Sequence, residues 1–146
     1  MAADITSSAD GYFARMRRGE LAPPPVSTTL GGHITAVDLE AGTLESGYHA
    51  GAGFLNPAGQ VQGGILGAML DDVTAFLVTA TLAPGEHCAT LSLNLSFLKP
   101  ARAGALQGRS RLVRRGRGVC HVAGELLQDG QLVATATAVC TVVAGR

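Results

Sequence analysis

The sequence predicts an α+β fold in which a curved antiparallel sheet wraps one long buried helix. The 19 residues 65–83 are almost all apolar, with threonines and one pair of aspartates as the polar exceptions. A helix that is apolar on all sides is buried. Two strand-like runs precede this segment and four follow it, and the late connections are too short for parallel crossovers.

Before the helix, three segments are expected. Ser7 or Ser8 can cap a short amphipathic helix at about residues 7–19, and the prolines at 23–25 end it. Residues 29–55 hold two strand-like runs separated by "EAGT", which predicts a hairpin. A chain of 146 residues is the size of one ordinary domain, so we expect a single domain over residues 1–146.

After the helix, the pattern changes to strands. In "TLSLNLSF" the odd positions 91, 93, 95 and 97 are apolar and the even positions are polar, which predicts one half-buried strand. The "QDGQ" at 128–131 predicts a tight hairpin. In the last strand the even positions 132–140 are mostly small, so this face is expected to lie close to the buried helix.

Composition excludes several classes of protein. Hydrophobic residues make up 47% of the chain, and 11 basic residues balance 11 acidic ones. This composition is typical of neither a disordered chain nor a strongly basic nucleic-acid binder. The three cysteines and four histidines lack the spacing of metal ligands, so we expect no metal. Reduced cysteines and the absence of a targeting segment predict a cytoplasmic protein.

The buried helix is long enough to raise the alternative of a membrane span, and residues 63–67 form a GxxxG. However, Asp71 and Asp72 lie at its middle, and each would cost roughly 2.5 to 3.5 kcal/mol on insertion scales. We therefore expect the helix in a protein core and no membrane partner.

The start of this helix and its acids are the candidate site. Gly63 and Gly64 leave the first backbone N–H groups open to a ligand oxygen, although on the glycine pair alone, close packing is the stronger explanation. A carboxylate in an apolar helix is costly unless it is paired, hydrated or in a cleft, and partial desolvation would suit a general base. An ordinary surface acid at a gap in the sheet is the alternative for either aspartate.

Spacing links these two features to assembly. Gly63 and Asp71 are eight residues apart, or ~12 Å along one helix. Reacting groups must approach to ~3 to 3.5 Å, so one helix does not bring both to one carbon atom. Two antiparallel helices across a two-fold axis would do so, and the chemistry therefore requires a dimer.

The segment "NPAGQVQGGILGAMLD" at 56–71, followed by "TLSLNLSFLKPA" at 90–101 and three further strands, resembles the hotdog-fold acyl-CoA thioesterases of the phenylacetate-pathway (PaaI-like) type. The resemblance covers roughly residues 29–143. It implies a hotdog fold, a homodimer with dimers joining as tetramers, and hydrolysis of a small or medium acyl-coenzyme A, aromatic acyl groups included. Coenzyme A is then part of the substrate, and no cofactor is expected.

The resemblance also implies roles for single residues. The backbone N–H of Gly63 polarises the thioester carbonyl, and Asp71 of the partner subunit is the general base or nucleophile. Asn56 helps to hold the carbonyl or the attacking water, and Thr90 assists that water. Asp72 receives no role.

Gln62 departs from the pattern, because the family usually has histidine before the glycine pair. Glutamine donates and accepts hydrogen bonds but does not titrate near neutral pH, so it orients a group without sharing a proton. The alternative function is therefore a non-catalytic acyl-CoA-binding protein. A hotdog dehydratase is a weaker third choice, because the site has no histidine for that chemistry.

Seven of the 11 basic residues fall within 19 positions, from Lys99 to Arg117. Such a strip could bind the phosphates of coenzyme A together with Gly64, or it could be a charged, solvated strand edge. Nucleic acid is disfavoured by the neutral total and the few aromatic residues. The candidate phosphate-binding residues are Lys99, Arg102, Arg114, Arg115 and Arg117.

Overall fold

The computed structural model describes residues 11–144 and contains three helices, one short 3-10 turn and six strands among them. In chain order these elements are α1 (Tyr12–Arg17), α2 (Pro25–Thr29), β1 (His33–Asp38), β2 (Thr43–Ala50), η1 (Ala52–Phe54), α3 (Gly63–Thr79), β3 (Glu86–Phe97), β4 (Gly104–Arg115), β5 (Val119–Gln128) and β6 (Gln131–Ala144).

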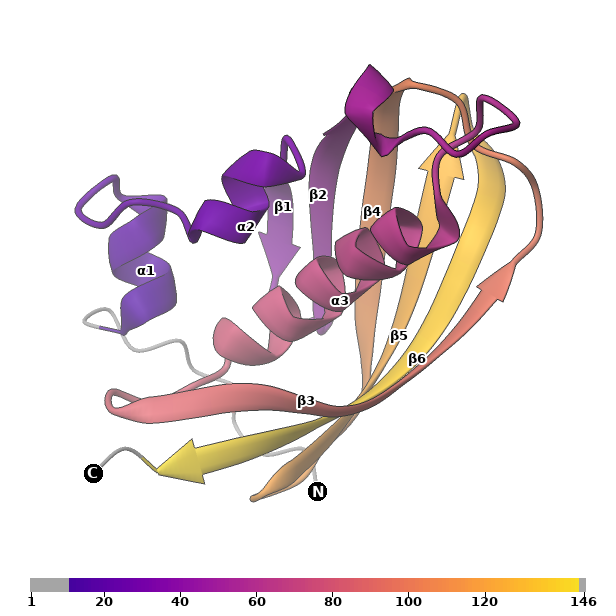
Figure 1. Cartoon of the computed structure of the whole chain (residues 1–146). Helices are drawn as coiled ribbons and strands as arrows, with labels where there is room; N and C mark the ends of the chain where they lie inside the picture. The colour runs from indigo at the N-terminus through magenta and orange to yellow at the C-terminus, as the bar shows by residue number, and fades with distance from the viewer. Residues whose placement is uncertain (1–10, 145–146) are drawn as a thin grey trace.

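The six strands form one antiparallel sheet with the order β1-β2-β4-β5-β6-β3. The strand that follows α3 therefore lies at the edge of the sheet, beside the last strand of the chain. Figure 1 shows the sheet curving around α3, which crosses its concave face. The predicted α+β fold with a wrapped central helix is confirmed.

The central helix α3 is buried because it is apolar on every side. Its largest side chains, such as Met69, Leu70 and Leu77, are completely buried, and the helix contacts β2, β3, β4, β5 and β6. The small even face of β6 lies in the core, as predicted, with Ala134 and Ala138 buried. Within the part of the chain that the structure describes, no helix is both long and apolar enough to cross a membrane.

Two predicted hairpins are also confirmed. β1 pairs with β2, and β5 pairs with β6 through the turn at 129–130. Asp129 has φ 51° and Gly130 has φ 75°. Two successive residues with positive φ are the signature of a type I′ turn, whose twist matches that of the flanking strands.

The N-terminal region differs from the prediction. The helix expected at about 7–19 is the shorter α1, and residues 7–10 with their proposed serine cap lie outside the described residues. The prolines at 23–25 do not simply end a helix, because Pro25 begins α2. Proline suits the first helical position, since its fixed φ is already helical and its missing N–H would have no partner there.

The prediction for β3 is wrong over part of its length. The register against β6 shifts between Thr90 and Ser92, so Leu91 sits in a β-bulge. The bulge reverses which face each later residue occupies. Leu93 and Leu95 point inward as predicted, whereas Leu91 is 64% exposed and Thr90 is turned toward α3.

Replacing Gly124 with alanine is expected to lower the free energy of unfolding by about 1–3 kcal/mol, which urea titration would measure. A Cβ at this buried position of β5 would lie 2.8 Å from Thr74 Cγ2. Thr74 cannot easily rotate away, because its hydroxyl donates to the Leu70 carbonyl at 2.8 Å. The matched control is Gly118→Ala, where a Cβ meets nothing within 4 Å. Equal stability of the two variants would contradict this account.

Candidate active site

The first backbone N–H groups of α3 are open to solvent. Gln62 is the residue before the helix, and its side chain does not cap it. Ile65 N and Leu66 N both bond to the carbonyl of Gln62, but within residues 11–144 the N–H groups of Gly63 and Gly64 donate no hydrogen bond. Gly64 is exposed, and a Cβ there would meet nothing within 4 Å. This helix start can therefore bind an oxyanion or a polarised carbonyl oxygen.

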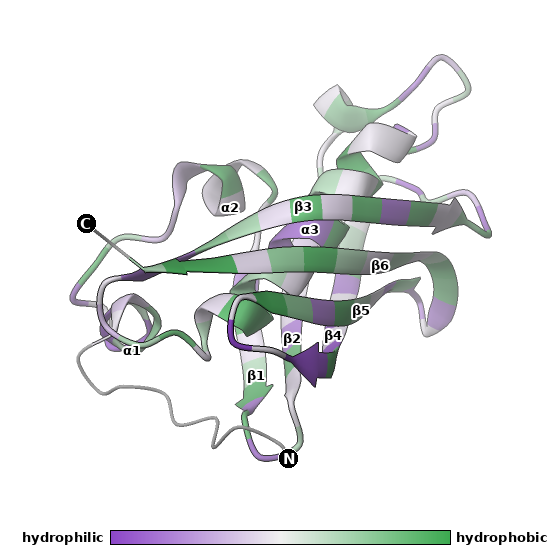
Figure 2. Ribbon diagram, turned by 90° about the horizontal axis from the view of Figure 1, so that it is seen from below, coloured by the Kyte–Doolittle hydropathy of each residue, from purple (hydrophilic) through white to green (hydrophobic). Residues whose placement is uncertain are grey.

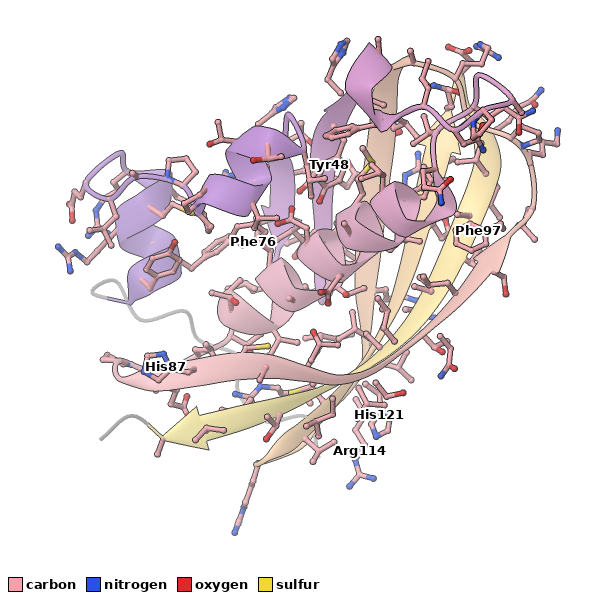
Figure 3. The ribbon with its side chains drawn as sticks, viewed as in Figure 1. Tyr48, Phe76, His87, Phe97, Arg114 and His121 are labelled. Atoms are coloured by element: carbon pink, nitrogen blue, oxygen red, sulfur yellow. The ribbon has the colours of Figure 1, made fainter. Side chains whose placement is uncertain are left out.

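The glycine at the helix start has a packing role as well. A Cβ at Gly63 would lie 3.2 Å from the ring of Phe97, and a Cβ at Gly67 would lie 2.7 Å from Leu95 Cδ1. Figure 3 shows Phe97 on β3 beside the beginning of α3. The glycines therefore serve both purposes: they allow close packing on β3, and the helix start that they form has N–H groups without a partner among the described residues.

Asn56 lies in the loop before α3 and shapes it. Its Oδ1 accepts hydrogen bonds from the backbone N–H groups of Ala58 and Gln60, at 3.0 and 3.1 Å. The loop is then held to the rest of the fold by Val61 N, which donates to the Ala101 carbonyl, and by Gln62 N, which donates to Phe54. Within the described residues the Asn56 amide nitrogen donates no hydrogen bond. Asn56 therefore fixes the path into the helix and keeps its amide N–H donors available.

Asp71 and Thr90 are brought together by the packing of α3 on β3. The Thr90 hydroxyl donates to Asp71 Oδ1 at 2.8 Å. This contact depends on the β-bulge at Leu91, which turns Thr90 inward. In the part of the chain described by the structure, the second carboxylate oxygen of Asp71 accepts no hydrogen bond, so it can act on a water molecule or a substrate.

Asp71 and Thr90 line a cavity of about 290 Å³ whose other walls include the apolar side chains of Val26, Ala75 and Phe76. A carboxylate beside an apolar cavity is an arrangement that suits acid–base or nucleophilic chemistry on a bound acyl group.

Cys88 also lines this cavity, and sequence reasoning did not assign it to the site. A hydrogen bond with Cys140, together with burial, raises the pKa of the Cys88 thiol. A thiol in this state is a poor nucleophile, because the thiolate is the reactive form. Of the two groups, Asp71 is therefore the better placed reactive one.

Asp72, which had no predicted role, ties three elements together. Its Oδ2 accepts from the Tyr48 hydroxyl of β2 at 2.7 Å, and its Oδ1 accepts from Ser27 of α2 at 3.1 Å. Burial raises the pKa of Asp72, although both hydrogen bonds oppose that shift. Burial and the neighbouring Asp72 raise the pKa of Tyr48 as well, so Tyr48 remains a neutral donor. Both acids line the cavity, but both carboxylate oxygens of Asp72 accept hydrogen bonds from α2 and β2, whereas Asp71 accepts only the bond from Thr90 among the described residues.

The structure does not bring Gly63 and Asp71 of one chain to the same point. They are on one straight helix, eight residues apart, which corresponds to ~12 Å. Within residues 11–144, no group of three or more His, Cys, Asp and Glu side chains is placed to hold a metal ion.

The basic strip is divided between the two ends of the sheet. Lys99 and Arg102 lie in the loop between β3 and β4, where Lys99 Nζ donates to Gln131 and Arg102 pairs with Asp129. At the other end of β4, Arg115 Nε donates to Thr81 Oγ1 at 2.9 Å, beyond the end of α3. Arg114 and Arg117 are exposed there, and Figure 3 shows Arg114 on the side of the sheet away from α3. One chain therefore does not form a single phosphate site from these residues.

Comparison with known proteins identifies the family to which the chain belongs. The family model of the acyl-CoA thioesterase N-terminal domain matches residues 52–141, which include α3 and most of the sheet. No curated protein matches the sequence. A solved phenylacetic acid degradation-related protein from Ralstonia eutropha JMP134 is 70% identical, with a TM-score of 0.89 over 90% of this chain and 99% of that one.

Two more distant structures share the fold. A thioesterase family protein from Silicibacter pomeroyi has a TM-score of 0.80 at 23% identity, covering 91% of this chain and 99% of that one. The E. coli PaaI protein from the phenylacetic acid degradation operon has a TM-score of 0.80 at 19% identity, covering 91% and 94%. The matched family model and the 70% identical relative show that the chain belongs to the acyl-CoA thioesterase family and is a thioester hydrolase with the hotdog fold.

Proposed function

We propose that the protein hydrolyses an acyl-coenzyme A thioester with a small or medium acyl group, aromatic ones included, at a site shared by two subunits. The observation that carries this proposal is the Asp71 carboxylate, held by Thr90 at 2.8 Å and facing a largely apolar cavity of about 290 Å³. The products are the free acid and the thiol of coenzyme A, and water supplies the added oxygen and hydrogen.

Asp71 is the reactive group in this proposal. It either removes a proton from the attacking water or attacks the thioester carbon directly, forming an anhydride that water then cleaves. Because Thr90 holds Oδ1, the carboxylate presents Oδ2 in a fixed orientation. Gly63 N–H, from the partner subunit, donates to the oxygen that becomes negative as the carbonyl carbon turns tetrahedral. Asn56 and Gln62 position the carbonyl and the water from the same helix start.

The proposed dimer uses the edge of the sheet. β3 is a 12-residue edge strand, and Leu91, Phe97 and Leu98 on or beside it are more than half exposed. Long edge strands with exposed apolar side chains are ready to pair with another chain. Antiparallel pairing of two β3 strands would continue the sheet and set the two α3 helices antiparallel. A pair of such dimers forms the proposed tetramer.

The same pairing reunites the basic residues. In one chain Lys99 and Arg102 lie at one end of the sheet, while Arg114, Arg115 and Arg117 lie at the other end. Because a two-fold axis reverses the partner's strands, one set from each subunit comes to the same end of the joined sheet. These residues, with the exposed Gly64 N–H, are the proposed contacts for the phosphates of coenzyme A.

Asp71→Asn is expected to lower kcat by at least about 100-fold, because asparagine neither accepts the proton nor attacks the thioester. The measurement is release of free thiol from acetyl-, butanoyl- and phenylacetyl-coenzyme A. The matched control is Asp72→Asn, which changes the neighbouring acid in the structural network and is expected to remain far more active. Equal rates for wild type and Asp71→Asn would contradict the assignment.

Gln62 favours a second candidate function, a non-catalytic acyl-CoA-binding protein. The side chain is exposed at the helix start and has no titratable group. Saturable binding of an acyl-coenzyme A without release of thiol would support this second function over the first.

Gln62→His is expected to add an ionisation at a pKa of about 6.5 to the pH dependence of kcat/KM, because histidine titrates there and glutamine does not. The profile would be measured from pH 5 to 9, with Gln60→His as a control in the loop before the helix. Superimposable profiles for wild type and Gln62→His would show that residue 62 does not contact the reacting groups.

A further inference from the structure

A second cavity lies next to the cavity that Asp71 lines. The neighbouring cavity, of about 390 Å³, lies between the N-terminal segment and strands β1 and β2, where His33, Ile34 and Ser46 contribute to its lining. Asp72 and Phe76 line both cavities, and the described lining of the two cavities has no other residue in common. The wall between the two spaces is therefore formed where these two side chains of α3 meet the N-terminal segment.

Phe76 has the larger of the two side chains that line both cavities. It is only 8% exposed, and it lies one helical turn after Asp72 on the same face of α3. Figure 3 shows its side chain reaching from α3 toward α1 and α2. A ring in this place stops a chain that enters beside Asp71 from continuing past the helix.

Asp72, the other shared residue, is hydrogen-bonded to α2. Ser27 Oγ of α2 donates to Asp72 Oδ1 at 3.1 Å. Pro24 and Val26 line the cavity on the Asp71 side of this bond, while Pro23 and Ser27 line the other cavity. The short segment that carries α2 thus passes over α3 with one cavity on each side of it.

The far cavity has both apolar and polar lining. Met16, Ile34 and Phe76 give it an apolar part, Arg17, His33 and Ser46 add polar groups, and its volume exceeds that of the cavity at Asp71. Without the ring of Phe76, Asp72 would be the one described side chain that still lines both spaces, whose volumes are about 390 and 290 Å³. A chain of methylene groups would gain from entering this space, because each buried CH₂ contributes to binding.

We propose that Phe76 is a specificity-determining residue that limits the length of the acyl group, and that the cavity behind it is a distal acyl site which opens when the ring is removed. This inference rests on the proposed thioesterase function, since it uses Asp71 as the point at which the thioester carbon is held.

The test is a series of straight-chain thioesters, from butanoyl- to tetradecanoyl-coenzyme A, with wild type, Phe76→Ala and Phe76→Leu. For the wild-type protein, kcat/KM should fall sharply once the acyl chain exceeds a certain number of carbon atoms. Phe76→Ala should move this limit to longer chains and raise the ratio of kcat/KM for the first rejected thioester to kcat/KM for butanoyl-coenzyme A about tenfold or more. Phe76→Leu keeps more of the packing and should give a smaller shift in the same direction.

The matched control is Phe13→Leu, which reduces another buried ring of the N-terminal segment without lying in the shared wall. An unchanged length profile in both Phe76 variants, with wild type active, would overturn the inference and leave the proposed function intact. An equal shift in Phe13→Leu would also overturn it, since general loosening would then explain the result. If the wild-type protein hydrolyses neither the straight-chain thioesters nor an aromatic one such as phenylacetyl-coenzyme A, the proposed function itself fails.

Discussion

The packing of α3 against the edge strand β3 is the constraint on which the site depends. Gly63 and Gly67 allow Phe97 and Leu95 to lie directly on the helix. At the other end of this contact a β-bulge turns Thr90 inward, so that its hydroxyl meets Asp71. A charge on an otherwise apolar helix is costly to bury, and here it gains one donor and an opening to a cavity.

The position of β3 at the edge of the sheet connects the proposed chemistry of Asp71 with the proposed dimer. The strand that holds Asp71 through Thr90 is also the strand whose backbone is free to pair with another chain. The N–H groups at the helix start lie ~12 Å from Asp71, which is too far for both to act on one carbon. Meanwhile Asp72 joins α3 to α2 and β2, which fixes the rotation of the helix. Figure 2 shows β3 and β6 side by side in front of α3, with apolar residues along both.

Strong periodic or compositional signals in the sequence predict the corresponding elements correctly. The apolar helix, the turn at 129–130 and the small face of β6 each appear as predicted, although α3 spans residues 63–79 and the apolar run continues past it to residue 83. The bulge at Leu91 was missed because the polar and apolar residues continue to alternate through it. The partners of Asp72, Ser27 and Tyr48, lie 45 and 24 residues away, and no local pattern marks such contacts. The same holds for the division of the basic strip.

The most direct test of a shared site is a mixed dimer of Asp71→Asn with Gly63→Pro. Proline is tolerated at the first position of a helix but has no N–H, so this variant loses the oxyanion donor and keeps the helical backbone of α3. Its Cβ also presses on the ring of Phe97, so the matched control is Gly63→Ala, which adds the same Cβ and keeps the N–H. Each of the two parent variants alone should be inactive. Mixed dimers, purified through two different tags, should recover about half the wild-type activity, since one of the two sites is intact. Mixed dimers as inactive as their parents would contradict the account, because both groups would then act within one chain.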